Sequence, residues 1–290
     1  MSVQILLRID KKENIENIYE NKEIMFSCAA NWIDYAIKQS DYKIGDLTEG
    51  VFARVKYPLT STIRDKKNKP IGNNLLISCI EGTNDCFLRY IPVITTPVLC
   101  FFSLDIKKEF TKYEVNKNEY IELFLEKVVN CFYNMNDNSS EYSILVIKNI
   151  EKFYDDLDKN LRQATKSLSC EGYVGGKVDK IFLGQQVNYN KYDFLQYFKD
   201  NTFDARSLFY KNKDYEYQNE YRIVLNGFHF SQRYELNGEY DYKKNLLKVK
   251  LPNLCKYAEI LYLSKYKSIQ FSHYNEDNFY MKYILRENNL

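Results

Sequence analysis

Histidine, glycine, proline and closely spaced cysteines are scarce in this sequence of 290 residues. It contains 2 His, 10 Gly, 5 Pro and 7 Cys, and no two cysteines have C-x-x-C spacing. The cysteines lie at positions 28, 79, 86, 100, 131, 170 and 255. This scattered spacing argues against the usual zinc motifs and against a disulfide framework. We therefore predict no metal site, and reduced thiols in a cytoplasmic protein.

Long hydrophobic runs and an excess of one charge are missing too. The longest apolar segment, residues 91–104, is interrupted by Pro92 and Pro97 and is shorter than the about 20 residues of a membrane helix. The N-terminal residues have no basic segment followed by an apolar run, so we expect no signal peptide and no membrane association. With 41 basic and 39 acidic residues, the net charge of +2 gives no overall attraction to nucleic acid. The basic segment Arg64–Lys69, near Tyr57, leaves a local nucleic-acid contact open.

Short apolar and alternating segments predict more strands than helices. Strands are expected at residues 3–9, 23–28, 93–104, 142–148, 177–183, 221–230, 246–251, 258–264 and 279–285. Helices are expected at residues 11–22, 117–134, 149–166 and 190–200. Because these elements do not alternate as regular βαβ units, we predict an α+β fold with mixed or mainly antiparallel sheets and packed helices. We expect residues 1–290 to form a single domain with a helical insertion around residues 105–166.

The most informative segment runs from Gln218 to Leu225, QNEYRIVL, where polar side chains enter an expected buried strand. In an extended chain, Gln218 and Glu220 lie on one side, so the pair can hold a substrate hydroxyl and a nucleophile together. Tyr215 and Tyr217, just upstream, can stack on a planar ring. This Gln-x-Glu pair is the first candidate for chemistry.

Two further residues on separate strands complete a possible site. Arg8 lies near the end of the first expected strand, and Ser27 ends the strand EIMFSC. An arginine suits a pyrophosphate because its planar fork donates two hydrogen bonds to phosphate. Each residue alone also fits a structural role: an edge charge for Arg8, a turn for Ser27, and a cross-strand ion pair at Glu220.

In this order, Arg8, Ser27 and Gln218-x-Glu220 resemble the pattern of ADP-ribosyltransferases. The resemblance implies an ADP-ribosyltransferase-like fold, with NAD as substrate. Arg8 would contact the NAD phosphate or ribose, Ser27 would brace the nicotinamide pocket, and Glu220 would stabilise the positive ribose that forms when the nicotinamide bond breaks. Gln218 would orient the acceptor, and Tyr215 or Tyr217 would stack on nicotinamide or on a target base.

A second resemblance covers more of the chain. Segments 18–36, 98–105, 175–183 and 208–225, with Glu49-Gly50, are similar to a widespread bacterial family of unknown function. That family typically has a Phe-Ser followed by an Asn-Asp-Pro-x-Glu-like segment, and it ends in Glu-x-Glu-Tyr-Arg. The Pro of the first segment is missing here. This resemblance implies that Glu220 is important and names no reaction.

We therefore expect an ADP-ribosyltransferase-like protein that uses NAD to modify an unknown macromolecule, protein or nucleic acid, or that hydrolyses NAD. Within the resembled family, Gln-x-Glu goes with acceptors other than arginine, such as amides or nucleobases. Such activity is toxic, which suggests a role in toxin action or phage defence. The alternatives are a non-catalytic interaction module and a metal-dependent nucleic-acid-processing protein that would use the carboxylates Asp34, Asp46, Glu49 and Glu220.

Overall fold

A computed structural model of the chain describes residues 4–39, 49–56, 75–79, 82–105, 121–130, 141–170, 181–189, 205–211, 213–230, 245–275 and 280–287. Its centre is a six-stranded sheet with the order β10-β11-β6-β1-β8-β14. The strands are β10 (Phe182–Gln186), β11 (Glu220–Leu225), β6 (Val98–Asp105), β1 (Gln4–Lys11), β8 (Tyr142–Ile147) and β14 (Ala258–Tyr262). Every pairing in this sheet is antiparallel, which confirms the predicted α+β class with mainly antiparallel sheets.

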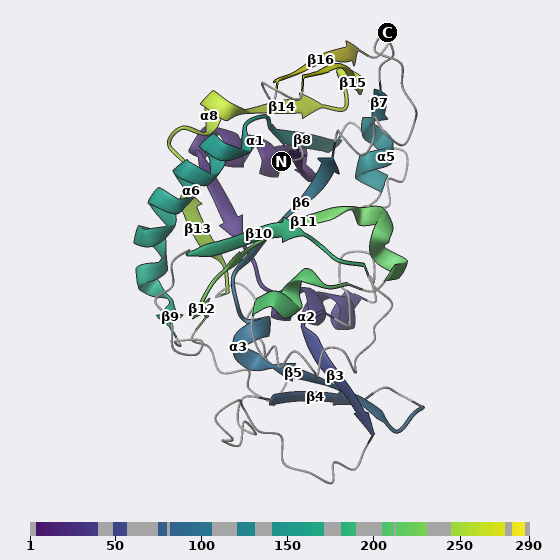
Figure 1. Cartoon of the computed structure of the whole chain (residues 1–290), viewed down its shortest axis with the longest axis vertical. Coiled ribbons are helices and arrows are strands. Elements are labelled where there is room, and N and C mark those ends of the chain that lie inside the picture. Colours follow the sequence, from purple (N-terminus) through teal and green to yellow (C-terminus); the bar gives the residue numbers. More distant parts are fainter. Residues whose placement is uncertain are drawn as a thin grey trace.

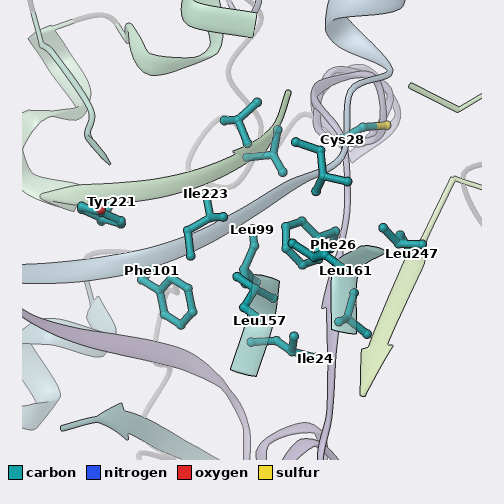
Figure 2. Close-up of a cluster of buried hydrophobic side chains, with 14 of the residues drawn as sticks. Ile24, Phe26, Cys28, Leu99, Phe101, Leu157, Leu161, Tyr221, Ile223 and Leu247 are labelled. Carbon is teal, nitrogen blue, oxygen red and sulfur yellow. The ribbon is translucent and has the colours of Figure 1, made fainter. Parts of the chain in front are cut away.

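Apolar side chains cover both faces of this sheet, because neighbouring residues of a strand point to opposite sides. Leu6 of β1 belongs to one buried cluster, whereas Leu7 belongs to the other. On the Leu6 face, helix α6 (Ile150–Ala164) contributes Phe153 and Leu157. Figure 2 shows this cluster, where side chains from β2 (Glu23–Phe26), β6, α6, β11 and β13 (Leu247–Lys250) point toward one another.

Smaller sheets and short helices surround the centre. The remaining strands form β3-β5-β4 (Val51–Lys56, Asp85–Tyr90, Leu75–Cys79), β16-β15-β7 (Tyr280–Glu287, Tyr266–Asn275, Ile121–Phe124) and β12-β9 (Phe228–His229, Ser169–Cys170). The sheet β3-β5-β4 and the pair β15-β16 lie at opposite ends of the molecule (Figure 1). The other helices are α1 (Lys12–Asn21), α2 (Ala29–Gln39), α3 (Ile91–Ile94), α5 (Leu125–Asn130), α8 (Leu254–Tyr257), η3 (Thr165–Ser167), η4 (Ala205–Phe209) and η5 (Lys213–Gln218).

The pairing of β1 with β6 is incomplete, and this positions the candidate site. Their ladder ends at Leu7 and Phe102, although β1 continues to Lys11 beside β8. Further along β6, Ser27 pairs with Val98 through an isolated antiparallel bridge, with N–H···O distances of 2.9 and 2.7 Å. Between the two pairings, one edge of β6 is left open around Cys100.

One predicted helix is wrong. Residues 117–134 were expected to be helical because of their apolar stripe, but residues 121–124 form strand β7, and the helix begins only at Leu125. Pairing of β7 with β15 overrides the local helical pattern, as tertiary contacts often do. The expected strand at 93–104 begins instead at Val98, after the short helix α3 and Pro97. The helix predicted at 190–200 lies outside the described residues.

The single-domain organisation stays a prediction. Within the expected insertion at residues 105–166, β8 lies between β1 and β14 in the main sheet, and α6 packs on that sheet.

Candidate functional site

A cavity of about 180 Å³ opens where β1 and β6 stop pairing. Four of the six predicted site residues line it: Arg8, Ser27, Gln218 and Glu220. The other described lining residues are Leu7, Ile9, Met25, Trp32, Val98, Cys100, Phe101, Phe102, Lys211 and Arg222. Residues about two hundred positions apart in the sequence therefore meet at one place, as the predicted pattern requires.

The two predicted tyrosines do not line the cavity. Tyr215 lies beside it, with its ring centroid 4.8 Å from the Nζ atom of the lining residue Lys211. Tyr217 is 46% exposed and belongs to the surface of η5. Stacking of either ring on a ligand stays a prediction.

Glu220 is buried at the start of β11 and is held by two cations. Its Oε1 accepts a hydrogen bond from Nε of Arg222 at 2.9 Å, and its Oε2 accepts one from Nη2 of Arg222 at 3.1 Å. Nζ of Lys211 lies 3.3 Å from the same Oε2. The backbone N–H of Glu220 donates to the Tyr189 hydroxyl at 2.7 Å. Both carboxylate oxygens of Glu220 are therefore fixed in position.

Arg222 joins Glu220 to a second buried carboxylate, Glu49. Its Nη2 donates to Oε2 of Glu49 at 3.0 Å, and its Nη1 donates to the other oxygen and to the backbone carbonyl of Leu208. The guanidinium carbon lies 5.3 Å from the centroid of the Trp32 ring, a cation–π geometry. The cross-strand ion pair that the sequence left open at Glu220 is instead a pair within one strand, because Glu220 and Arg222 both belong to β11.

The charges of this network keep it ionised. Burial raises the pKa of Glu220, but the positive charges of Arg222 and Lys211 outweigh it and bring the pKa well below the ordinary value. Burial lowers the pKa of Arg222, and the charges of Glu220 and Glu49 raise it by more. Burial and the Glu220 charge raise the pKa of the Cys100 thiol well above its ordinary value, so this thiol stays protonated.

Gln218 lines the cavity because of a backbone conformation that differs from the predicted extended strand. It ends the 3-10 helix η5, and Asn219 has a positive φ of 40°, so residues 218–220 are not extended. Hydrogen bonds hold this turn: Asn219 Nδ2 donates to the Ser103 carbonyl, and Asn219 Oδ1 accepts from Gln186 Nε2 at 2.7 Å. The turn at Asn219, rather than strand alternation, brings Gln218 and Glu220 to the same cavity.

Arg8 and Ser27 close the gap along the open edge of β6. Nη1 of Arg8 donates to the Cys100 carbonyl at 2.9 Å, and its Nε is buried with no hydrogen-bond partner among the described residues. The Ser27 hydroxyl accepts from Nδ2 of Asn31 at 3.0 Å. Arg8 is therefore positioned at the cavity with hydrogen-bonding capacity left on its guanidinium.

Sequence reasoning missed Lys211, Arg222, Trp32 and Cys100. Arg222 carried a usable signal, because it lies two residues after Glu220 in a strand and therefore on the same face. Lys211, Trp32 and Cys100 carried none, since their place at the cavity depends on how separate segments pack.

No protein-family model, curated protein or solved structure matches this chain. Both family resemblances therefore rest on its own residues. Within the described ranges, no group of three or more His, Cys, Asp and Glu could hold a metal ion. The part of the chain that the structure describes also contains no helix of the length and apolarity needed to cross a membrane.

Proposed function

We propose that this protein binds NAD at the cavity and cleaves the bond between nicotinamide and ribose, passing ADP-ribose to a macromolecule or to water. The observation that carries the proposal is the meeting of Arg8, Ser27, Gln218 and Glu220 around one cavity. Three separate segments of the chain supply these residues, in the order found in the ADP-ribosyltransferase pattern.

The chemistry of the cavity suits this reaction. Cleavage of the nicotinamide–ribose bond places positive charge on the ribose, and a preorganised carboxylate nearby stabilises that charge. Glu220 is such a carboxylate, because its pKa is lowered and its two oxygens are fixed by Arg222 and Lys211. The rings of Trp32 and Phe102, which also line the cavity, offer apolar surface for the nicotinamide.

The size of the cavity limits what it holds. Its volume of about 180 Å³ is below the about 300–1,000 Å³ of sites that enclose a drug-sized ligand. We therefore assign it to the nicotinamide riboside end of NAD, with the pyrophosphate near Arg8 and the adenosine outside. Nε of Arg8, which has no hydrogen-bond partner in the described part of the chain, would donate to a phosphate oxygen.

The first test is release of nicotinamide from NAD by the wild-type protein. Glu220→Gln should lower the rate by about 10²–10³-fold, the range for loss of one preorganised electrostatic contact to a transition state. Glu216→Gln is the matched control, because it makes the same change at an exposed position of η5 and should leave the rate unchanged. Arg8→Met should raise KM for NAD more than it lowers kcat. A wild-type protein that releases no nicotinamide would refute the proposal.

A fixed structural network is the second candidate, and one observation favours it: Arg222 contacts the carboxylates of both Glu220 and Glu49. A non-catalytic interaction module would need no more than this. In that case Glu220→Gln would lower the thermal unfolding midpoint, and wild type would show no nicotinamide release. The metal-dependent alternative loses support, because Glu49 and Glu220 converge on a guanidinium. Asp46 lies outside the described residues.

The biological setting belongs to the proposal as well. We place the protein in the cytoplasm, where NAD is available and where cysteine thiols stay reduced. Consumption of NAD or modification of a macromolecule would be toxic to a cell. A role in toxin action or phage defence follows from that toxicity, and the loss of cell growth on expression, reversed by Glu220→Gln, would test it.

A further inference from the structure

We propose that the acceptor of the ADP-ribosyl group is a protein carboxylate, and that Lys211 selects it. This inference rests on the proposed function of the cavity and names the substrate class that the same site accepts. It replaces the amide or nucleobase acceptor that the Gln-x-Glu resemblance implies.

Lys211 is a buried ammonium group placed at the acceptor-orienting residue. It is 5% exposed, and its Nζ donates to Oε1 of Gln218 at 2.6 Å. Its contact with Oε2 of Glu220 is longer, at 3.3 Å. Because Arg222 already contacts both oxygens of Glu220, Lys211 can turn toward an incoming anion while Glu220 remains held.

The charges around the cavity favour an anionic acceptor over a cationic one. The described lining residues include three cations, Arg8, Lys211 and Arg222, and Glu220 is their one anion. With Arg8 assigned to the NAD pyrophosphate and Arg222 held between Glu49 and Glu220, Lys211 is the lining cation left to face an acceptor. A guanidinium or ammonium acceptor would meet like charge at Lys211, which costs free energy in a buried site.

The need for a general base also favours a carboxylate acceptor. A hydroxyl, amide or guanidinium nucleophile must lose a proton when it attacks the ribose. Of the described ionisable groups on the cavity wall, Glu220 has both oxygens engaged by cations and is a weak base, and Cys100 is already protonated. A carboxylate needs no such help, because it is deprotonated before it binds.

The step balances without any further reactant. A carboxylate oxygen forms a bond to C1′ of the ribose while the bond from C1′ to the nicotinamide nitrogen breaks. The electron pair of the broken bond stays on that nitrogen, which loses its positive charge, and the carboxylate loses its negative charge. The products are neutral nicotinamide and an ADP-ribosyl ester, and no proton moves.

A carboxylate also fits better than a terminal phosphate of a nucleic acid. Lys211 offers a single positive charge to the acceptor. A carboxylate brings one negative charge, whereas a phosphate monoester brings about 1.5–2 at neutral pH. We therefore commit to aspartate or glutamate side chains of a protein.

The experiment offers three acceptors to the wild-type protein with NAD labelled in its adenosine part: a glutamate-rich peptide, an arginine-rich peptide and an oligonucleotide with a 5′-phosphate. Nicotinamide release is measured in the same tubes. We expect label on the glutamate-rich peptide that neutral hydroxylamine removes, as it does from esters. Label on either of the other acceptors, or nicotinamide release with no labelled acceptor, overturns the inference while the proposed function stands. Absence of nicotinamide release overturns both.

Variants of Lys211 then test its role. Lys211→Met should lower the ratio of peptide labelling to NAD hydrolysis by about 10-fold or more, the effect of losing a charged hydrogen bond in a buried site. Lys211→Arg keeps the charge and should restore most of the ratio. Lys213→Met removes a charge at a neighbouring exposed position and should leave the ratio unchanged. Equal ratios for Lys211→Met and wild type would overturn the assignment of Lys211.

Discussion

Arg222→Met should destabilise the protein strongly, because Arg222 holds two buried carboxylates together. The side chain of Arg222 is 1% exposed, and its guanidinium contacts Glu49 and Glu220. Methionine fills a similar volume without charge. The substitution therefore leaves both carboxylates buried without this guanidinium, while Lys211 stays 3.3 Å from Glu220.

The expected magnitude follows from the geometry. Removal of one partner from a buried, hydrogen-bonded ion pair costs about 3–5 kcal/mol, since the other charge stays desolvated. A protein domain has a total free energy of unfolding of about 5–15 kcal/mol, so this loss is a large fraction of the stability. The double variant Glu49→Gln/Arg222→Met should lose less free energy of unfolding than Arg222→Met alone, because one fewer buried carboxylate has lost its contact with Arg222.

Urea unfolding monitored by circular dichroism measures the change in the free energy of unfolding. The change is taken from the shift in the urea midpoint, provided that the dependence of free energy on urea concentration is the same in both proteins. Arg162→Met is the matched control. Arg162 pairs with Asp158 at 3.2 Å, but the two side chains are 61% and 41% exposed. Such an exposed pair contributes about 1 kcal/mol or less. If Arg222→Met and Arg162→Met lower the free energy of unfolding equally, the network is not the buried support described here.

Two further predictions concern the pH dependence of stability at Glu220 and the packing around Gly184. The folded pKa of Glu220 lies below its ordinary 4.5, so the carboxylate stabilises the protein above pH 4.5 and this contribution is lost as the pH falls toward the folded pKa. Wild type should therefore lose stability more steeply than Glu220→Gln between pH 4.5 and about pH 3 in urea titrations, and parallel curves would contradict the ionised network. Gly184→Ala should cost about 1–3 kcal/mol in thermal or urea unfolding, because an added Cβ would lie 2.6 Å from the Tyr154 hydroxyl and 2.8 Å from that of Tyr221. A stability equal to wild type would show that this tyrosine pair moves aside freely.

Much of the fold was predictable, because strand patterns are local. The segments LLKVKL and AEILYLS alternate or carry β-branched residues over short stretches, and they form β13 and β14 close to the expected bounds. The prediction of a helix at residues 121–124 was wrong because it also used the local pattern alone. Its apolar stripe fits a helix as well as a strand, and only pairing with β15 decides between them.

The candidate site was predictable in its residue types and in their order along the chain. Arg8, Ser27, Gln218 and Glu220 could be selected because each is a polar residue in or next to an expected apolar strand, with the chemistry that one reaction needs. Their common cavity was a hypothesis until the strand order β11-β6-β1 placed them together.

The sequence by itself determined the α+β class, most of the strands and the residues that carry useful chemistry, since these follow from local patterns and side-chain types. The tertiary structure decided where those residues meet and in which charge state. The contact of Arg222 with Glu49 joins residues 173 positions apart, and the approach of Lys211 to Glu220 depends on the turn at Asn219. No local pattern encodes such contacts, because burial and neighbouring charges arise only when distant segments pack against one another.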